Sequence, residues 1–253
     1  MATVFALRDK WAKGETVFGI FASLPCAFAC EVAALPGVDY ICVDQQHGVC
    51  DYRDMVEMAR GIDARGAVPL TRVPANEDWI IGKNLDAGAQ GVIVPMVSTP
   101  REAAKAVAAC RYPPKGERSN GPARAAIVMG TRDQKALGDG VLCLPMIETR
   151  EGLDNVDAIA ATPGLDGLYI GPSDLAISLG LGPGLDRDEP EHVAAVAKIL
   201  AACQKHKIIP GIHTGSARFA KKFSAQGFRL VTFGGDAGFL RAGIERAVGE
   251  LRG

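Results

Sequence analysis

The feature that most constrains this chain is a series of short apolar runs, each followed by a longer stretch with helical spacing. The runs are rich in Val, Ile and Leu and are apolar almost throughout, which is typical of parallel strands buried on both faces. Eight strands are predicted, over residues 17–23, 40–44, 67–73, 91–96, 141–148, 167–171, 208–213 and 229–233. The clearest helices are predicted over residues 99–110, 189–206 and 238–252.

This order of elements favours a (β/α)₈ TIM barrel made of one domain, residues 1–253. Eight strand–helix units in about 250 residues match the size and the alternation of that fold. The alternative is a doubly wound open sheet, which usually has fewer strands and a glycine-rich first turn. Neither GxGxxG after the first strand nor GxxxxGK[ST] anywhere is present in the sequence.

The charge balance disfavours partners that are recognised through long-range electrostatics. The chain has 28 Lys and Arg against 29 Asp and Glu, so no strong field favours nucleic acid or an anionic membrane. No secretory signal and no apolar run long enough to cross a bilayer are found. The seven cysteines contain no CxxC pair, which disfavours a disulfide framework or a structural zinc site. A cytoplasmic location is expected.

Ionisable side chains follow several of the predicted strands at the point where each strand ends. In TIM barrels the active site lies at the carboxyl ends of the strands. We therefore expect one site that contains Asp44, His47, Arg72, Glu148, Asp174 and His213. The segment 111–130 is too long and polar for an ordinary turn, and it is either functional or a solvated excursion.

Glu148 and Asp174 are the candidate metal ligands, because they follow consecutive parallel strands. Sparse carboxylate ligation with open positions suits Mg²⁺ or Mn²⁺ better than zinc. The alternative is that Asp174 caps a helix and Glu148 lies on the surface. Arg72 is a candidate for holding a substrate carboxylate or an enolate oxygen, and the alternative is a structural ion pair.

The histidines differ in their predicted roles. His47 lies three residues after Asp44, which is positioned to select its tautomer, and this pair favours proton transfer. His192 and His206 fall in a helical stretch and are interpreted as ordinary helix residues. A Schiff-base mechanism is disfavoured because no lysine ends a strand. Asp86 precedes a strand, so its place in the barrel alone predicts the opposite end.

Several blocks of this sequence resemble the HpcH/HpaI family of class II, metal-dependent pyruvate aldolases. They are VDQQHG, TRV, LDAGAQGVIVPMV, RYPPKGERSNG, PMIETREGLDNVDAI and GLDGLYIGPSDLAISLG, and they extend over nearly the whole chain. The resemblance implies a barrel of the phosphoenolpyruvate/pyruvate type. It also implies a homohexamer, a trimer of dimers, in which the C-terminal helix is exchanged between subunits.

The resemblance further implies the reaction and the residues that carry it. Pyruvate or hydroxypyruvate would form an enolate that adds reversibly to an aldehyde. Mg²⁺ or Mn²⁺, with Co²⁺ as a further option, would be held by Glu148 and Asp174, and the backbone from Gly171 through Pro172 and Ser173 to Asp174 would hold the carboxylate. Arg72 would stabilise the enolate, His47 with Asp44 would govern proton transfer, and Asp86 would assist across a subunit boundary. Arg118 and Arg124 would contact the aldehyde.

Two positions depart from the family pattern, and other functions remain open. Gln46 replaces a glutamate that many relatives carry before the histidine, and His213 occupies a position that is often apolar, where it would shape the aldehyde pocket. The alternative functions are a lyase for CoA esters, an oxaloacetate decarboxylase and a non-catalytic barrel that binds keto acids.

Overall fold

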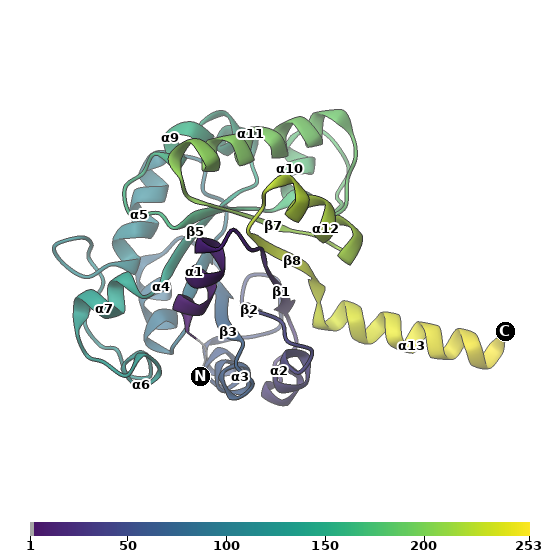
Figure 1. Ribbon diagram of the computed structural model, residues 1–253, viewed down its shortest axis with the longest axis horizontal. Helices are drawn as coiled ribbons and strands as arrows, with labels where there is room; N and C mark the ends of the chain where they lie inside the picture. Colours follow the sequence, from purple (N-terminus) through teal and green to yellow (C-terminus); the bar gives the residue numbers. More distant parts are fainter. Residues whose placement is uncertain (1–2) are drawn as a thin grey trace.

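Eight parallel strands close into a barrel in the computed structural model, which describes residues 3–253 (Figure 1). Each strand pairs with the next one along the chain, and the last pairs with the first. The strands are β1 Val17–Ala22, β2 Tyr40–Asp44, β3 Val68–Arg72, β4 Gly91–Val94, β5 Leu142–Ile147, β6 Gly167–Ile170, β7 Ile209–His213 and β8 Leu230–Gly235. The predicted TIM barrel is confirmed, and the open sheet is excluded.

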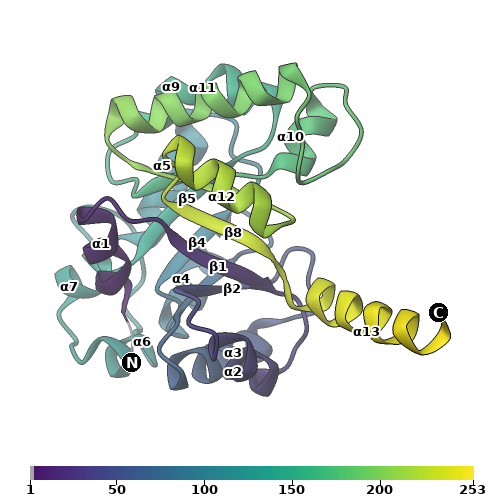
Figure 2. The ribbon, with the colours of Figure 1, turned by 45° about the vertical axis from the view of Figure 1, so that its right-hand side comes forward.

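Helices surround the barrel and follow each strand (Figures 1 and 2). They are α1 Val4–Ala12, α2 Ala27–Ala34, α3 Tyr52–Ala64, α4 Asp78–Asp86, α5 Pro100–Cys110, α6 Ala125–Met129, α7 Gln134–Asp139, α8 Arg150–Asp154, α9 Val156–Ala160, α10 Pro172–Ser178, α11 Pro190–His206, α12 Ala217–Gln226 and α13 Asp236–Arg252. The long polar segment 111–130 forms a loop that ends in the short helix α6.

Local sequence signals explain where the predicted helices begin. At α5, the Thr99 hydroxyl accepts the Glu102 amide at 3.2 Å, and the Glu102 carboxylate accepts the Thr99 amide at 3.0 Å. This capping box satisfies two backbone donors that a helix start leaves free. Helix α13 begins at Asp236, two residues before the predicted start.

The apolar residues form an inner and an outer layer, and helix α1 covers one end of the barrel. Val4 and Leu7 of α1 pack with barrel-interior residues such as Tyr40 and Leu70. The Trp11 indole also donates to the carbonyl of Arg229, just before β8. Since α1 covers the N-terminal ends of the strands, the polar groups at the carboxyl ends are the ones left for chemistry.

Helix α13 extends away from the barrel (Figures 1 and 2). None of its 17 residues is buried, and Leu240, Ile244 and Leu251 are each more than half exposed. In a single chain these apolar side chains stay exposed to solvent.

Candidate active site

An ion pair between Asp44 and Arg72 lies at the carboxyl ends of β2 and β3, the end of the barrel that we call the rim. The two residues are direct partners in the parallel register. Arg72 donates to both Asp44 oxygens, from Nε at 2.9 Å and from Nη2 at 2.6 Å. Burial alone would raise the pKa of Asp44, but the hydrogen bonds and charge of Arg72 hold that pKa below its ordinary value. The pair is therefore ionised, with the guanidinium fixed in one orientation.

Asp44 also shapes the loop that carries His47. Its Oδ1 accepts the backbone N–H groups of Gln46 at 3.1 Å and His47 at 3.3 Å. A β-carbon on Gly48 would lie 2.2 Å from the Asp44 carbonyl oxygen, so only glycine fits this tight turn. Asp44 thus positions His47 through the backbone, which differs from the direct contact with the imidazole that the spacing suggested. The side chain of His47 is exposed at the rim.

Glu148 is buried at the end of β5, and its exposed fraction is only 2%. The Met96 backbone N–H donates to Glu148 Oε1 at 2.7 Å, from a residue in the left-handed region with φ of 57°. The pKa of Glu148 is raised to about 6, mainly by burial and also by the charge of Asp174, while the Met96 amide and Arg72 oppose this rise. Mutual repulsion between two carboxylates is the electrostatic condition that a bound cation relieves.

Asp174 lies on the first turn of α10, immediately after β6, and is exposed to solvent. The turn comes close to Glu148, because a β-carbon on Gly171 would lie 2.3 Å from Glu148 Oε2. Among residues 3–253, no group of three or more His, Cys, Asp or Glu side chains is arranged to hold a metal. Glu148 and Asp174 therefore offer two carboxylates, and the other ligands would come from substrate and water.

His213 ends β7 and joins the same site through Phe21. The two rings make an edge contact, with centroids 4.7 Å apart, and the Arg72 guanidinium lies 5.1 Å from the Phe21 centroid. The pKa of His213 is lowered to about 4, mainly by burial and also by the charge of Arg72, while Asp44 opposes this. The imidazole is neutral near pH 7 and adds a polar group that carries no charge.

Asp86, Arg118 and Arg124 lie at the other end of the barrel. Asp86 ends α4 and accepts Arg118 Nη2 at 2.7 Å, and Arg124 pairs with Asp63 at the end of α3. Arg118 is nearly fully buried and stacks on the ring of Tyr112. Within one chain, these three predicted site residues are not brought to the rim.

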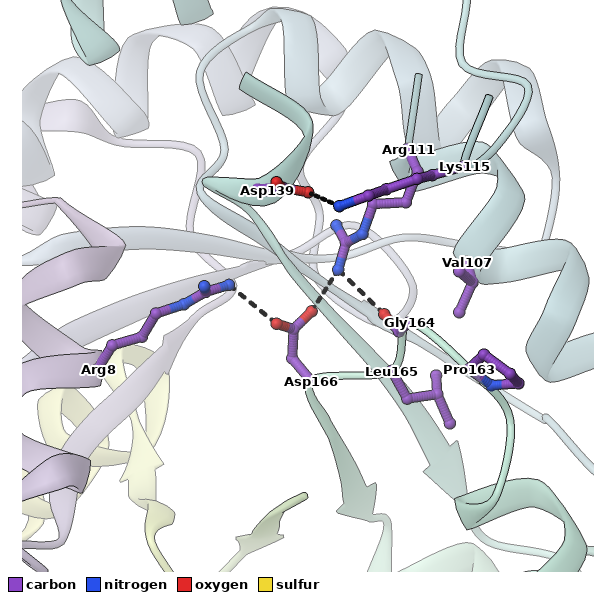
Figure 3. A pocket seen from close by; sticks show the side chains of 9 residues that line it. All are labelled: Arg8, Val107, Arg111, Lys115, Asp139, Pro163, Gly164, Leu165 and Asp166. Atoms are coloured by element: carbon purple, nitrogen blue, oxygen red, sulfur yellow. Dashed lines mark hydrogen bonds and ion pairs between the residues drawn. The ribbon is translucent and has the colours of Figure 1, made fainter. Parts of the chain in front are cut away.

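A cavity of about 600 Å³ also lies near this N-terminal end, between α1, α5 and the start of β6 (Figure 3). Its three cations are all paired with its two carboxylates. Asp166 accepts Arg8 at 2.9 Å and Arg111 at 2.6 Å, and Lys115 pairs with Asp139 at 2.8 Å. Arg111 also donates to the carbonyl of Gly164 (Figure 3). Because these cations are already paired, the cavity is a weaker candidate than the rim.

Comparison with known proteins identifies the family of this chain. The model of the family described as HpcH/HpaI aldolase/citrate lyase matches residues 18–242. The chain belongs to this family. It is accordingly an enzyme of the aldolase class, a carbon–carbon lyase, as the sequence motifs predicted.

Individual relatives match over almost the full chain. A hydroxypyruvate/pyruvate aldolase from Rhizorhabdus wittichii is 36% identical, over 97% of this chain and 98% of its own. A 5-keto-4-deoxy-D-glucarate aldolase from Salmonella arizonae is 34% identical, over 93% and 92%. The crystal structure of a family protein from Burkholderia cenocepacia superposes with a TM-score of 0.89 at 35% identity, over 98% and 99%.

Two contributions to the site carry no signal in the sequence. Met96 acts through its backbone amide, which every residue except proline possesses, and Phe21 looks like any other apolar strand residue. A pattern of polar residues at strand ends misses both.

Along residues 3–253, no helix is long and apolar enough to span a membrane.

Proposed function

We propose that the enzyme adds pyruvate, or a hydroxylated analogue such as hydroxypyruvate, reversibly to an aldehyde through an enolate. In the reverse direction it would split a 4-hydroxy-2-oxo acid into a 2-oxo acid and an aldehyde. The observation that carries this proposal is the buried Glu148 beside Asp174, on the same rim as Arg72. The relative named hydroxypyruvate/pyruvate aldolase supports the choice of donor.

Glu148 and Asp174 would hold Mg²⁺ or Mn²⁺, with Co²⁺ as a further option. The two residues fit a hard divalent cation, because both are carboxylates and the charge of Asp174 raises the pKa of Glu148. When bound, such an ion supplies Lewis-acid stabilisation of the keto acid's developing negative charge. The backbone from Gly171 through Pro172 and Ser173 would line the position of the substrate carboxylate.

The remaining rim residues would handle charge and protons. Arg72 is already oriented by Asp44, so it can face a developing enolate oxygen without reorganisation. His47 would exchange the proton at the donor's reacting carbon, and Asp44 would position it through the loop backbone. His213 would offer a neutral hydrogen-bonding group to a hydroxylated aldehyde. Gln46 has a buried Oε1 without a partner among the described residues, beside His47.

A homohexamer, a trimer of dimers with exchanged C-terminal helices, would complete the molecule. Exposed apolar side chains on α13 match an apolar cavity of about 490 Å³, which is lined mainly by α2 and the start of α13 and includes Phe28 and Val32. Insertion of α13 from a second subunit would bury both surfaces. Asp86, Arg118 and Arg124 would then reach a rim only from a neighbouring subunit. We place the enzyme in the cytoplasm.

Exchange of the pyruvate methyl protons in D₂O, followed by NMR, tests the proposed function. We expect exchange that requires Mg²⁺ or Mn²⁺ and that falls by about 10²–10⁴-fold in His47→Ala. His206→Ala is the matched control, because His206 pairs with Asp157 in the outer helical layer. A folded protein that exchanges no protons with any of the three metals would overturn the proposal.

A further inference from the structure

The two histidines of α11 have opposite surroundings. His206, at the end of the helix, pairs with the exposed Asp157 at 3.0 Å. His192, in the first turn, is 1% exposed, and its Nε2 lies 3.2 Å from the carbonyl oxygen of Pro172. His192 is a helix residue, as predicted, and its ring also contacts the segment that carries Asp174.

The chemistry of this contact fixes the state of the imidazole. A carbonyl oxygen only accepts hydrogen bonds, so Nε2 carries the hydrogen and donates it. Burial lowers the pKa of His192, which keeps the ring neutral. Nδ1 is then an acceptor, and it has no hydrogen-bond partner among residues 3–253. Burying an imidazole costs solvation free energy. The hydrogen bond to the Pro172 carbonyl is the main polar interaction that offsets this cost.

The position of Pro172 makes that bond relevant to the rim. Pro172 is the first residue of α10, Asp174 is the third, and Gly171 precedes the helix in contact with Glu148. The turn thus lies close to Glu148 and contacts the ring of His192. Proline has no backbone N–H, so at this residue only the carbonyl is available for a hydrogen bond.

We propose that His192 is a positioning residue for the metal site, which it serves by holding the Pro172 carbonyl and hence the direction of Asp174. The inference rests on the proposed function, because it takes Asp174 to be a metal ligand. Groups behind metal ligands commonly affect affinity, and their loss weakens metal binding by about 10–100-fold. His192 would act in this way through the backbone of α10.

A pair of amide substitutions separates the hydrogen bond from the bulk of the side chain. His192→Gln places its N–H near the position of Nε2, whereas His192→Asn has a shorter side chain that does not reach Pro172. His192→Phe keeps the ring without a donor, as a second test if the asparagine variant does not fold. His192 also borders a cavity of about 290 Å³ between α11 and α12, which leaves room for altered side chains.

The measurement is the Kd for Mn²⁺, by titration calorimetry on the assembled enzyme after EDTA treatment, with Tm recorded for each variant. We expect about 10-fold weaker binding in His192→Asn and His192→Phe, and binding within about threefold of wild type in His192→Gln. Ile199→Ala is the control, because Ile199 is buried on the same helix and its loss should lower Tm while leaving Kd unchanged.

The outcomes distinguish this inference from the proposed function. Wild-type protein that binds Mn²⁺, together with variants that bind it equally well, would overturn the role of His192 alone. Equal weakening in the glutamine and asparagine variants would do the same, since it would show that packing matters and the hydrogen bond does not. Wild-type protein that binds no Mn²⁺ would overturn both proposals.

Discussion

Replacing Glu148 by glutamine should stabilise the metal-free fold near neutral pH, although it removes a proposed metal ligand. Burial raises the pKa of Glu148 from 4.5 to about 6, so the folded state binds this proton more tightly than the unfolded chain. The resulting stability is fully present below pH 4.5 and is lost as the pH rises through about 6. The gap between these pKa values corresponds to about 2 kcal/mol at pH 7.5. Glutamine is neutral at every pH and keeps an oxygen for the Met96 amide.

Differential scanning calorimetry in EDTA, from pH 4.5 to 8, measures this effect. We expect Tm of Glu148→Gln to exceed that of wild type by about 4–8 °C at pH 7.5 and the two to converge at low pH. Glu117→Gln, at an exposed carboxylate, is the control and should leave the difference near zero. Mn²⁺ should then raise the Tm of wild type but not of Glu148→Gln. A glutamine variant that is less stable than wild type at pH 7.5 would refute the reasoning.

Three other substitutions test the rim. Gly171→Ala places a carbon 2.3 Å from Glu148 Oε2 and should weaken Mn²⁺ binding at least about 10-fold by calorimetry. Gly182→Ala is the control, because open space surrounds Gly182, and equal affinities of the two variants would contradict the predicted clash. Arg72→Lys keeps the charge but loses the paired hydrogen bonds to Asp44, so kcat/KM for aldol cleavage should fall about 10²–10³-fold. A fall of less than threefold would exclude a role of Arg72 in stabilising the enolate. His213→Leu should lower kcat/KM for a hydroxylated aldehyde relative to its deoxy analogue by about 10-fold, and an unchanged ratio would remove His213 from the aldehyde pocket.

Much of the fold could be predicted because its signals are local. The start of α5 follows from three side chains within four residues, Thr99, Pro100 and Glu102, and the structure contains that capping box. Buried parallel strands appear in the sequence as short apolar runs, and the predicted strand ends lie within two residues of those observed. The closed barrel follows from the number and alternation of these elements.

The sequence predicted mainly those site residues that lie at the ends of strands. Asp44, Arg72, Glu148 and His213 were found because side chains at the carboxyl ends of parallel strands share one edge. The contact of His192 with Pro172 could not be predicted, because a histidine in an amphipathic helix looks the same whether its ring meets water or a backbone carbonyl. The direction of the side chain depends on how α11 packs against α10.

The sequence by itself determined the order of strands and helices and the identity of most polar groups at the rim, because caps, periodicity and strand ends are properties of neighbouring residues. Only the tertiary structure decided what those groups contact. The pairing of Asp44 with Arg72 comes from the register between β2 and β3, and the raised pKa of Glu148 comes from its burial beside Asp174. The Met96 amide reaches Glu148 from another strand end. Such contacts depend on distances between residues far apart in the chain, and folding sets those distances.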